Sequence, residues 1–373
     1  MIALGAMSGT STDGVDVAAL HMDPGTGAIR FLGFQSDDFS PVLRHNLLQL
    51  QRIPFHGVDG QDPIGTMLEA RHQLTQAYAK AVHTLLETQG LEPEDVACVG
   101  AHGQTLRHRP ELGYTYQLFD GALLAARLGV DVVCDFRSKD IALGGQGAPL
   151  VPAFHQAWLA SRGIHERVAV LNLGGFSNLT VLKSKEESVI GGDCGPANCL
   201  MDEWARESFN QPFDLDGEIA ARGEPCKVLL EALWSHPFFH ADWPKSTGRD
   251  QFNSEWLKSC LQQAGAGLHP DDVMATLLAL SVRAVVHSMP SGLDVVYVCG
   301  GGSRNSTLMA QLALEIAPVQ CLPFENLGIP AQAVEAAAFA WLAVQRIQNN
   351  VSNCPTVTGA ARGTVLGALH SSL

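Results

Sequence analysis

The chain has 373 residues, of which 46% are hydrophobic and 17% are charged, and its formal net charge is −14. A chain of this length usually forms about two domains, and this composition is typical of a compact globular protein rather than a disordered one. Proteins that bind a nucleic-acid backbone gather Lys and Arg on one face, whereas this sequence holds no long basic run. The composition therefore argues against nucleic acid as a partner.

Nine cysteines are scattered along the chain without any C-x-x-C pair. This pattern favours reduced cysteines in a cytoplasmic protein over a zinc site or a redox motif. The amino-terminal stretch lacks the pattern of a secretory signal, and no segment reaches the roughly 20 apolar residues that a membrane span requires. We therefore expect a cytoplasmic protein without a membrane partner.

Hydrophobic patterning in the first part of the chain predicts three strands followed by alternating helices and strands. The strands are expected at 2–7, 15–21, 29–37, 96–101 and 130–134, and the helices at 62–88, 120–128 and 149–160. Nearly the same order follows a second time. Its strands are expected at 168–173, 179–183, 295–299 and 319–322, with a short one running into Gly191-Gly192-Asp193, and its helices at 197–209, 271–287, 306–317 and 333–345.

Two consecutive βββαβαβα halves, each opening with a glycine-rich hairpin, are the pattern of the actin, Hsp70 and sugar-kinase architecture. The sequence therefore predicts an α/β fold of two lobes with a central cleft. The first lobe is expected at 1–160, with 346–373 packing back on it, and the second at 161–345. Residues 213–263 interrupt the second half, and we expect them to form helical and loop insertions.

A glycine-rich turn with the sequence GTSTDGVD, at 9–16, separates the first two predicted strands. Glycine permits close backbone approach, and hydroxyl and N–H groups can bind phosphate oxygens, but the same residues also favour an ordinary β-turn. Asp13 or Asp16 could hold Mg²⁺ through water, because Mg²⁺ keeps much of its hydration shell. The nucleotide-binding residues that this interpretation names are Gly9, Thr10, Ser11, Thr12, Asp13, Gly14, Val15 and Asp16.

A second hairpin, NLGGFSN at 172–178, stands at the equivalent place in the second half. Two such hairpins favour a clamp on nucleotide phosphates over two unrelated turns. GGGSRN at 300–305 follows an apolar strand, and its small residues would let an adenine ring lie against the backbone; the alternative is a plain strand-to-helix turn. Neither the Walker A motif nor the G-x-G-x-x-G fingerprint occurs. The residues predicted here to bind nucleotide are Asn172, Gly174, Gly175, Gly301 and Gly302.

Polar side chains follow several predicted strands, where ligands bind in open α/β sheets. Asp193 precedes a helix, and its carboxylate is either a helix N-cap or a base facing the cleft. His102 ends one strand and is either a buried histidine or a substrate contact. Asp135 and Arg137 end the next strand, and the GGQGAP stretch at 144–149 could approach an anionic group through its N–H groups.

Eight motifs occur in order between residue 3 and about residue 367: MSGTSTDGVD, AHGQT, DFR, GGQGAPLVPAFHQA, NLGGFSN, DCGPAN, PKSTGRDQFN and VCGGGSRN. Together they resemble the anhydro-N-acetylmuramic acid kinase family. The resemblance implies that water opens the 1,6-anhydro bridge of 1,6-anhydro-N-acetylmuramic acid and that the freed O6 takes the γ-phosphate of ATP-Mg²⁺. It also implies a role in bacterial cell-wall recycling and a homodimer.

Carried over position by position, the resemblance assigns roles to five side chains. Asp193, in the DCGP motif, matches the family's catalytic base. Glu335, in AVEAAAFAWLA, matches an acidic position near the sugar. His102, Gln104 and Arg137 would contact the sugar or its lactyl carboxylate.

The chain departs from the family pattern at Ala197, which replaces a usual glycine, and at Ala101, where glycine or serine is common. If residue 197 required a positive φ, alanine there would cost about 1 kcal/mol or more, yet we expect activity to survive. One alternative is a kinase of an ordinary amino sugar that performs no ring hydrolysis. Another is a non-catalytic, nucleotide-responsive binding or filament protein.

Overall fold

The computed structural model describes residues 1–9, 11–51, 62–164, 166–182, 189–243, 245–249, 251–265 and 267–372. The chain divides into two compact units. Unit 1 comprises Met1–Ile164 and Ala333–Leu373, and unit 2 comprises His165–Gln332. The helix at 333–345, which the sequence pattern assigned to the second lobe, therefore belongs to unit 1 instead.

The main sheet of unit 1 has the strand order β13-β7-β4-β1-β2-β3. β1, β2 and β3 are antiparallel neighbours, β1, β4 and β7 run parallel, and β13 closes one edge in the antiparallel sense. The bounds are β1 (Ile2–Met7), β2 (Gly14–Met22), β3 (Ile29–Asp38), β4 (Val96–Ala101), β7 (Val132–Cys134) and β13 (Ala368–His370). A separate hairpin consists of β5 (Gln104–Arg109) and β6 (Tyr114–Leu118).

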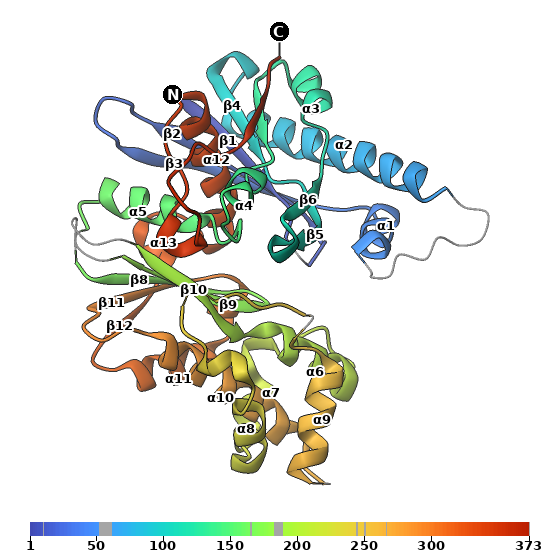
Figure 1. Ribbon diagram of the computed structural model, residues 1–373, viewed down its shortest axis with the longest axis vertical. Helices are drawn as coiled ribbons and strands as arrows, with labels where there is room; N and C mark the ends of the chain where they lie inside the picture. The colour runs from blue at the N-terminus through green and yellow to red at the C-terminus, as the bar shows by residue number, and fades with distance from the viewer. Residues whose placement is uncertain are drawn as a thin grey trace. The chain divides into compact units, whose positions relative to one another are not determined.

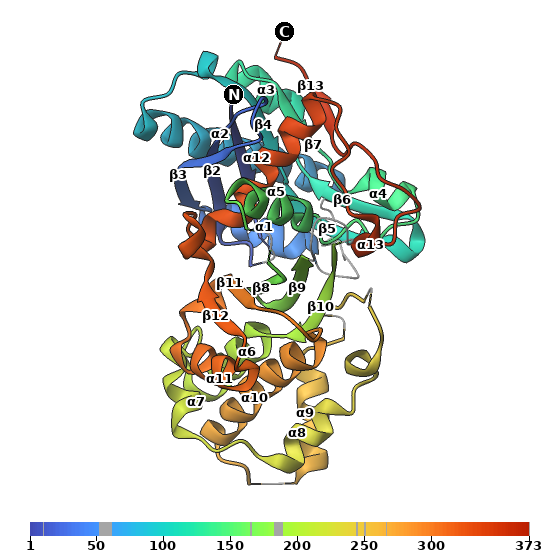
Figure 2. The ribbon, with the colours of Figure 1, turned by 90° about the vertical axis from the view of Figure 1, so that its left-hand side faces the viewer.

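Helices cover both faces of this sheet (Figures 1 and 2). The helices of unit 1 are α1 (Pro41–Gln51), α2 (Pro63–Gln89), α3 (Gly121–Leu128), α4 (Ser138–Ala142), α5 (Val151–Ser161), α12 (Val334–Ile347) and α13 (Pro355–Thr358). On one face α2 packs with α1 and α3 over buried side chains such as Leu4, Ala6 and Tyr78. On the other face α12 lies across β1, β2 and β4, with α5 beside it.

Two strand glycines allow α12 to lie directly on the sheet. A Cβ added to Gly5 would stand 1.9 Å from the backbone oxygen of Ala336, and one added to Gly100 would stand 2.1 Å from that of Phe339. Any residue with a side chain would therefore lift the helix, so glycine serves close backbone approach at both places. This contact also fixes the first turn of α12, which carries Glu335.

Unit 2 contains a sheet in the order β10-β9-β8-β11-β12. Its strands are β8 (Val168–Leu173), β9 (Phe176–Leu182), β10 (Ile190–Pro196), β11 (Val295–Cys299) and β12 (Gln320–Pro323). Its helices are α6 (Asn198–Phe209), α7 (Glu218–Arg222), α8 (Lys227–Trp234), α9 (Ser254–Ala264), α10 (Pro270–Ser288) and α11 (Ser306–Ile316). The almost entirely buried α10 packs against β9, β10 and several of the other helices, and so forms the centre of the apolar core.

The two sheets share one topology. In each, the first three strands are antiparallel neighbours and the fourth and fifth join the first strand in parallel, as β3-β2-β1-β4-β7 and β10-β9-β8-β11-β12. The predicted α/β fold with duplicated halves of the actin-like and sugar-kinase type is therefore confirmed. The central cleft concerns both units together and stays a prediction.

Several elements of the structure were not predicted. They are α1, the β5–β6 hairpin, α4, α13 and β13. The second hairpin is also tighter than expected, because Ser177 and Asn178 belong to β9 and only Gly174 and Gly175 form the turn. The insertion at 213–263 is helical as expected, with α7, α8 and the greater part of α9 inside it.

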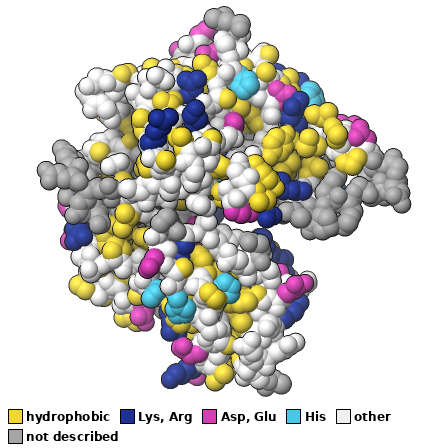
Figure 3. Space-filling view, in the orientation of Figure 1, with side chains coloured by type: hydrophobic (Ala, Val, Ile, Leu, Met, Phe, Trp, Pro, Cys, Tyr) yellow, Lys and Arg dark blue, Asp and Glu magenta, His cyan; other side chains and the backbone are white. Residues whose placement is uncertain are grey.

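Charged side chains of both signs occur in the same regions of the face shown in Figure 3, with polar and apolar side chains between them. Among the described residues, every helix is too short or too polar to cross a lipid bilayer.

Candidate functional site

The first glycine-rich turn is tied to the segment that follows β4. The Ser8 hydroxyl donates to the carbonyl oxygen of Gly103 over 3.1 Å and accepts from the Tyr78 hydroxyl over 2.9 Å. The Gln104 amide nitrogen donates to the carbonyl oxygen of Gly9 over 3.0 Å. Ser8, Tyr78 and Gln104 are all buried. Buried hydrogen bonds therefore fix Ser8 and Gly9 at the start of this turn. Thr10 lies outside the described residues.

The two aspartates of this turn differ in their surroundings. Asp13 is exposed and pairs with Arg44 over 3.0 Å, where a surface ion pair contributes little to stability. Asp16 lies in β2 opposite Met7 and Ser36 and is partly buried. Burial raises the pKa of Asp16, and a hydrogen bond from Ser36 partly opposes this shift. Of the two, Asp16 is the carboxylate without an ion pair in the described part of the chain.

Arg137 and His102 form one unit beyond the ends of β7 and β4. The guanidinium donates from Nε and Nη2 to His102 Nε2, over 3.1 and 2.9 Å, and from Nη1 to the Gly147 carbonyl oxygen over 2.7 Å. Since Nε2 accepts, the His102 ring is neutral with its proton on Nδ1. Burial, and then the charge of Arg137, lower the pKa of His102 to about 3. His102 is therefore a neutral acceptor that orients Arg137.

Two carboxylates share the electrostatic field of Arg137. Burial lowers the pKa of Arg137 to about 10, and the charges of Glu335 and Asp140 act against that shift. Burial raises the pKa of Glu335, whereas the Arg137 charge lowers it and the Asp16 charge raises it. Glu335 thus interacts both with the predicted sugar-binding cation and with the predicted magnesium carboxylate. The structure thus brings His102 and Arg137 into direct contact, and the charges of Arg137 and Asp16 both act on Glu335.

The second glycine-rich turn is held by the start of α6. The backbone N–H groups of Ala197 and Cys199 donate to the Gly175 carbonyl oxygen, each over 3.0 Å. The Asn198 amide nitrogen donates to the carbonyl oxygen of Gly174 over 2.7 Å. Among the described residues, no bond to the N–H groups of these two glycines is found. Their donors are therefore available to a ligand, as in anion-binding turns.

The turn at 300–302 lies against this hairpin. Gly300 has φ +83°, and a Cβ there would stand 2.2 Å from Asn172 Oδ1. A Cβ on Gly302 would stand 2.8 Å from Leu173 Cβ, while one on Gly301 would meet nothing within 4 Å. Glycine is therefore required at 300 and 302 for contact between the two turns, whereas Gly301 faces open space. The predicted nucleotide-binding glycines of unit 2 do lie together.

Asp193 lies inside β10, at a register shift opposite Asn178, and is not a helix N-cap. Its backbone N–H donates to the Lys245 carbonyl oxygen over 3.0 Å, and its Oδ2 accepts from the Thr247 N–H over 2.9 Å. Burial raises the pKa of Asp193 to about 6, although the bond from Thr247 lowers it. The carboxylate is thus fixed in place, its pKa lies close to neutral pH, and among the described residues it accepts from one backbone donor. These are the properties of a general base.

The departure at residue 197 is harmless in this structure. Ala197 has φ −119° and is buried before α6. Because φ is negative, the Cβ brings no left-handed strain, and the penalty considered for a positive φ does not arise.

Sequence reasoning missed several residues that build the site. Thr247 and Lys245 hold Asp193, Asn198 holds the second turn, and Ser8 and Tyr78 hold the first. The motifs PKSTGRDQFN and DCGPAN contain three of them, but a motif does not say which atom its residues contact. The Gln104 amide nitrogen donates to Gly9, and its Oε1 is buried without a partner among the described residues, so its role as a sugar contact stays a prediction.

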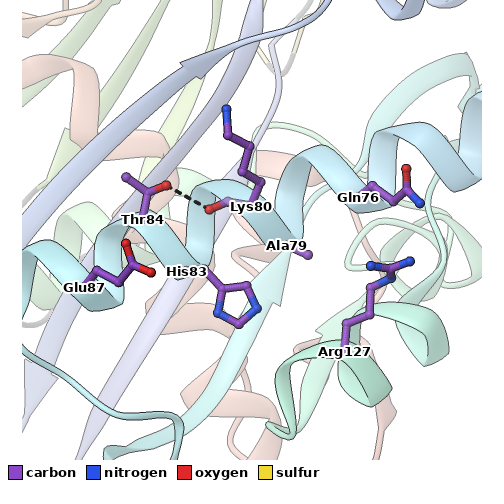
Figure 4. A pocket seen from close by; sticks show the side chains of 7 residues that line it. All are labelled: Gln76, Ala79, Lys80, His83, Thr84, Glu87 and Arg127. Carbon is purple, nitrogen blue, oxygen red and sulfur yellow. Dashed lines mark hydrogen bonds between the residues drawn. The ribbon is translucent and has the colours of Figure 1, made fainter.

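The structure also has a surface hollow away from these residues. A cavity of about 410 Å³ lies between α2 and α3, with Gln76, His83 and Arg127 among the side chains that line it (Figure 4). No residue predicted for the site lines it. In the described residues, no group of three or more His, Cys, Asp and Glu side chains is arranged to hold a metal ion.

Comparison with known proteins gives consistent results. A family model described as anhydro-N-acetylmuramic acid kinase matches residues 1–372. The protein of that name from Burkholderia lata is 45% identical over 380 residues, covering 99% of this chain and 96% of the relative. The one from Cupriavidus pinatubonensis is 45% identical over 377 residues, covering 98% and 97%.

A solved structure, a ROK family glucokinase from Streptomyces griseus in complex with glucose and AMPPNP, is 14% identical with a TM-score of 0.44. It covers 92% of this chain and 100% of its own. A likeness at this level supports no conclusion about fold or activity.

Proposed function

Because the chain belongs to the anhydro-N-acetylmuramic acid kinase family, we propose that it hydrolyses the 1,6-anhydro ring of 1,6-anhydro-N-acetylmuramic acid and phosphorylates O6 with ATP. The products are N-acetylmuramic acid 6-phosphate and ADP, in peptidoglycan recycling. The observation that carries the proposal is Asp193, a fixed carboxylate whose pKa burial raises to about 6.

Asp193 takes the proton of the attacking water. The water oxygen forms a bond to C1 while the C1–O6 bond breaks, and O6 then bonds to the γ-phosphorus as the bond to the ADP oxygen breaks. With a pKa of about 6, Asp193 is mostly ionised at pH 7 and is still a useful base, since proton transfer is efficient when the pKa lies near the working pH. The Thr247 N–H holds one carboxylate oxygen and leaves the other to the water.

Arg137 recognises the lactyl carboxylate of the sugar in this proposal. Of its five N–H groups, two go to His102 and one to Gly147. One N–H on each terminal nitrogen remains, which matches the two oxygens of a carboxylate. Glu335, in the first turn of α12, interacts with this cation and is proposed to lie near the sugar hydroxyls.

The glycine turns are proposed to hold ATP. The first turn would bind phosphate through residues 9–16, and the free N–H groups of Gly174 and Gly175 would bind it from unit 2. Gly301 would leave room for the adenine. Asp16 fits a water-mediated magnesium site better than Asp13, because Arg44 already neutralises Asp13. A bound Mg²⁺ would neutralise charge on the transferring phosphoryl group.

Replacing Gln104 by Leu tests whether this side chain serves the nucleotide turn or the sugar. The change removes the donor to the Gly9 carbonyl oxygen, so we expect the KM for ATP to rise about 5-fold with the KM for sugar unchanged. Gln117→Leu is the matched control, since Gln117 lies on β6 and its side chain, within the described part of the chain, bonds Thr105 and Thr115. A rise in the sugar KM alone would support Gln104 as a sugar contact.

The mass of the product tests the proposed reaction. Incubation with ATP and the anhydro sugar should give a product heavier than the sugar by one water and one phosphoryl group. N-acetylglucosamine is tested separately with ATP as the comparison substrate. Addition of a phosphoryl group without water, or phosphorylation of N-acetylglucosamine at a comparable rate, would favour the kinase of an ordinary amino sugar.

The resemblance also leads us to propose a cytoplasmic homodimer. Sedimentation analysis of the purified chain checks the oligomeric state.

A further inference from the structure

Asp140 is a fully buried carboxylate in unit 1 whose charge acts on Arg137 and to which the sequence assigned no role. Its Oδ1 accepts from Asn353 Nδ2 and from the Thr358 hydroxyl, each over 2.8 Å, and its Oδ2 accepts from the Gly147 N–H over 2.8 Å. In the described residues it has no ion pair. A buried charge is retained only where donors compensate for lost water, and here three donors do so.

The Gly147 residue connects this carboxylate to Arg137. Its N–H donates to Asp140 and its carbonyl oxygen accepts from Arg137 Nη1 over 2.7 Å. Gly147 has φ +67°, and a Cβ there would stand 2.8 Å from Ile141 Cγ1. Residue 147 must therefore be glycine in this tightly packed loop, and the position of its carbonyl oxygen determines the direction of the bond from Arg137 Nη1.

The carboxyl-terminal segment supports the same loop from its other side. The Gln146 N–H donates to the Thr358 carbonyl oxygen over 2.6 Å, in addition to the side-chain bonds of Thr358 and Asn353 to Asp140. A Cβ on Gly145 would stand 2.2 Å from Asp140 Oδ2, so the loop lies directly on the carboxylate. Asn353 and Thr358, each more than 200 positions from Asp140 in the chain, thus both bond its carboxylate.

We propose that Asp140, held by Asn353 and Thr358, is a positioning residue that sets the orientation of the Arg137 guanidinium through Gly147 and thereby the recognition of the substrate carboxylate. This inference rests on the proposed function, because it takes Arg137 as the carboxylate-binding residue. Three N–H groups of Arg137 are committed to two fixed acceptors, so a shift of the Gly147 carbonyl rotates the two that remain. Carboxylate and phosphate recognition by arginine depends on this fork geometry.

The charge of Asp140 acts in the same direction. Together with Glu335 it favours the cationic form of Arg137, whose burial works against the charge. Loss of the carboxylate would weaken both the placement and the charge of the guanidinium.

Steady-state kinetics of three variants test the proposal. Thr358→Val removes one donor to Asp140 at nearly constant shape, and we expect the KM for the anhydro sugar to rise about 5-fold with kcat and the KM for ATP within twofold. Thr358→Ser keeps the hydroxyl and should restore the natural KM. Asp140→Asn places an amide among three donors, and its sugar KM should rise more than that of Thr358→Val.

The matched control is Ser372→Ala, because Ser372 ties the same carboxyl-terminal segment to Asp131 and not to the Arg137 loop. A second readout is competition by 1,6-anhydro-N-acetylglucosamine, which has the same ring without the lactyl carboxylate. Thr358→Val should weaken binding of the carboxylate-bearing sugar about 5-fold and leave this competitor unaffected.

Two results would overturn the inference. One is an equal loss of affinity for both sugars in Thr358→Val, and the other is an unchanged sugar KM while the natural chain turns the sugar over normally. If Asp140→Asn fails to fold, the comparison of Thr358→Val with Thr358→Ser still tests the inference. If the natural chain itself does not phosphorylate the anhydro sugar, the proposed function fails, and the inference fails with it.

Discussion

Turnover is expected to fall by at least about 10³-fold when Asp193 is replaced by Asn, because the attacking water then loses its base. The amide oxygen of Asn can still accept the Thr247 N–H, so the fold around residue 193 should be preserved. The measurement is kcat from ADP release with the anhydro sugar as substrate. Near-natural turnover would remove Asp193 as the base.

The pH dependence gives an independent signature of the same residue. Burial raises the pKa of Asp193 from 3.8 to about 6, so kcat should rise with pH through about 6 and then level off as the carboxylate ionises. Asp202 on α6 is a matched control, since burial raises its pKa to about 6 as well. Asp202→Asn should keep the profile. A pH profile that shifts in Asp202→Asn would show that Asp202, and not Asp193, is the group that titrates.

The raised pKa also has a consequence for stability. A carboxyl group that binds its proton more tightly in the folded state stabilises the fold at low pH, and this contribution is present below pH 3.8 and is lost as the pH rises through about 6. The ionised Asp193 is therefore a cost to the fold at neutral pH. Asp193→Asn should unfold at an equal or higher urea concentration than the natural chain while it loses turnover.

Gly5→Ala is expected to lower the free energy of unfolding by about 2–3 kcal/mol, the upper part of the range for overpacking a core. The added methyl would stand 1.9 Å from a backbone oxygen of α12, and neither atom can rotate away. The urea-unfolding midpoint measures this loss. Because α12 carries Glu335 in its first turn, the KM for the sugar should rise as well.

Gly25→Ala is the control for that change, because its Cβ would meet only the Asp23 carboxylate, at 3.4 Å. Its midpoint should equal that of the natural chain. If Gly5→Ala matched Gly25→Ala in midpoint, the backbone of α12 could not lie on β1 as described.

The sheet topology could be predicted because its strands are short apolar runs bounded by glycine turns, as at Ile2–Met7 and Val295–Cys299. The β5–β6 hairpin was missed because its sequence is polar, and most of its side chains are not buried. The helix at Val334–Ile347 was recognised from its apolar pattern but assigned to the wrong unit. The helical pattern predicts which face of the helix is apolar. It does not predict which sheet that face packs on, and in the structure this is the sheet that carries Gly5 and Gly100.

The candidate site was predicted unevenly for the same reason. Glycine turns and polar strand ends mark Gly174, His102 and Asp193 locally. The bond from Thr247 to Asp193 joins residues 54 positions apart, and nothing in the spacing indicates it. Asp140 carries no local signal of its role, since its two side-chain partners lie 213 and 218 residues away.

The division of the chain has a consequence for its biosynthesis. Unit 2 is one continuous stretch, whereas unit 1 is made of Met1–Ile164 and Ala333–Leu373. Domains generally fold as they leave the ribosome, the amino-terminal one first. Here the nascent sheet of unit 1 must wait, with the face around Gly5 and Gly100 uncovered, until all of unit 2 has been translated and α12 emerges. The later unit is therefore free to complete its fold before the earlier one.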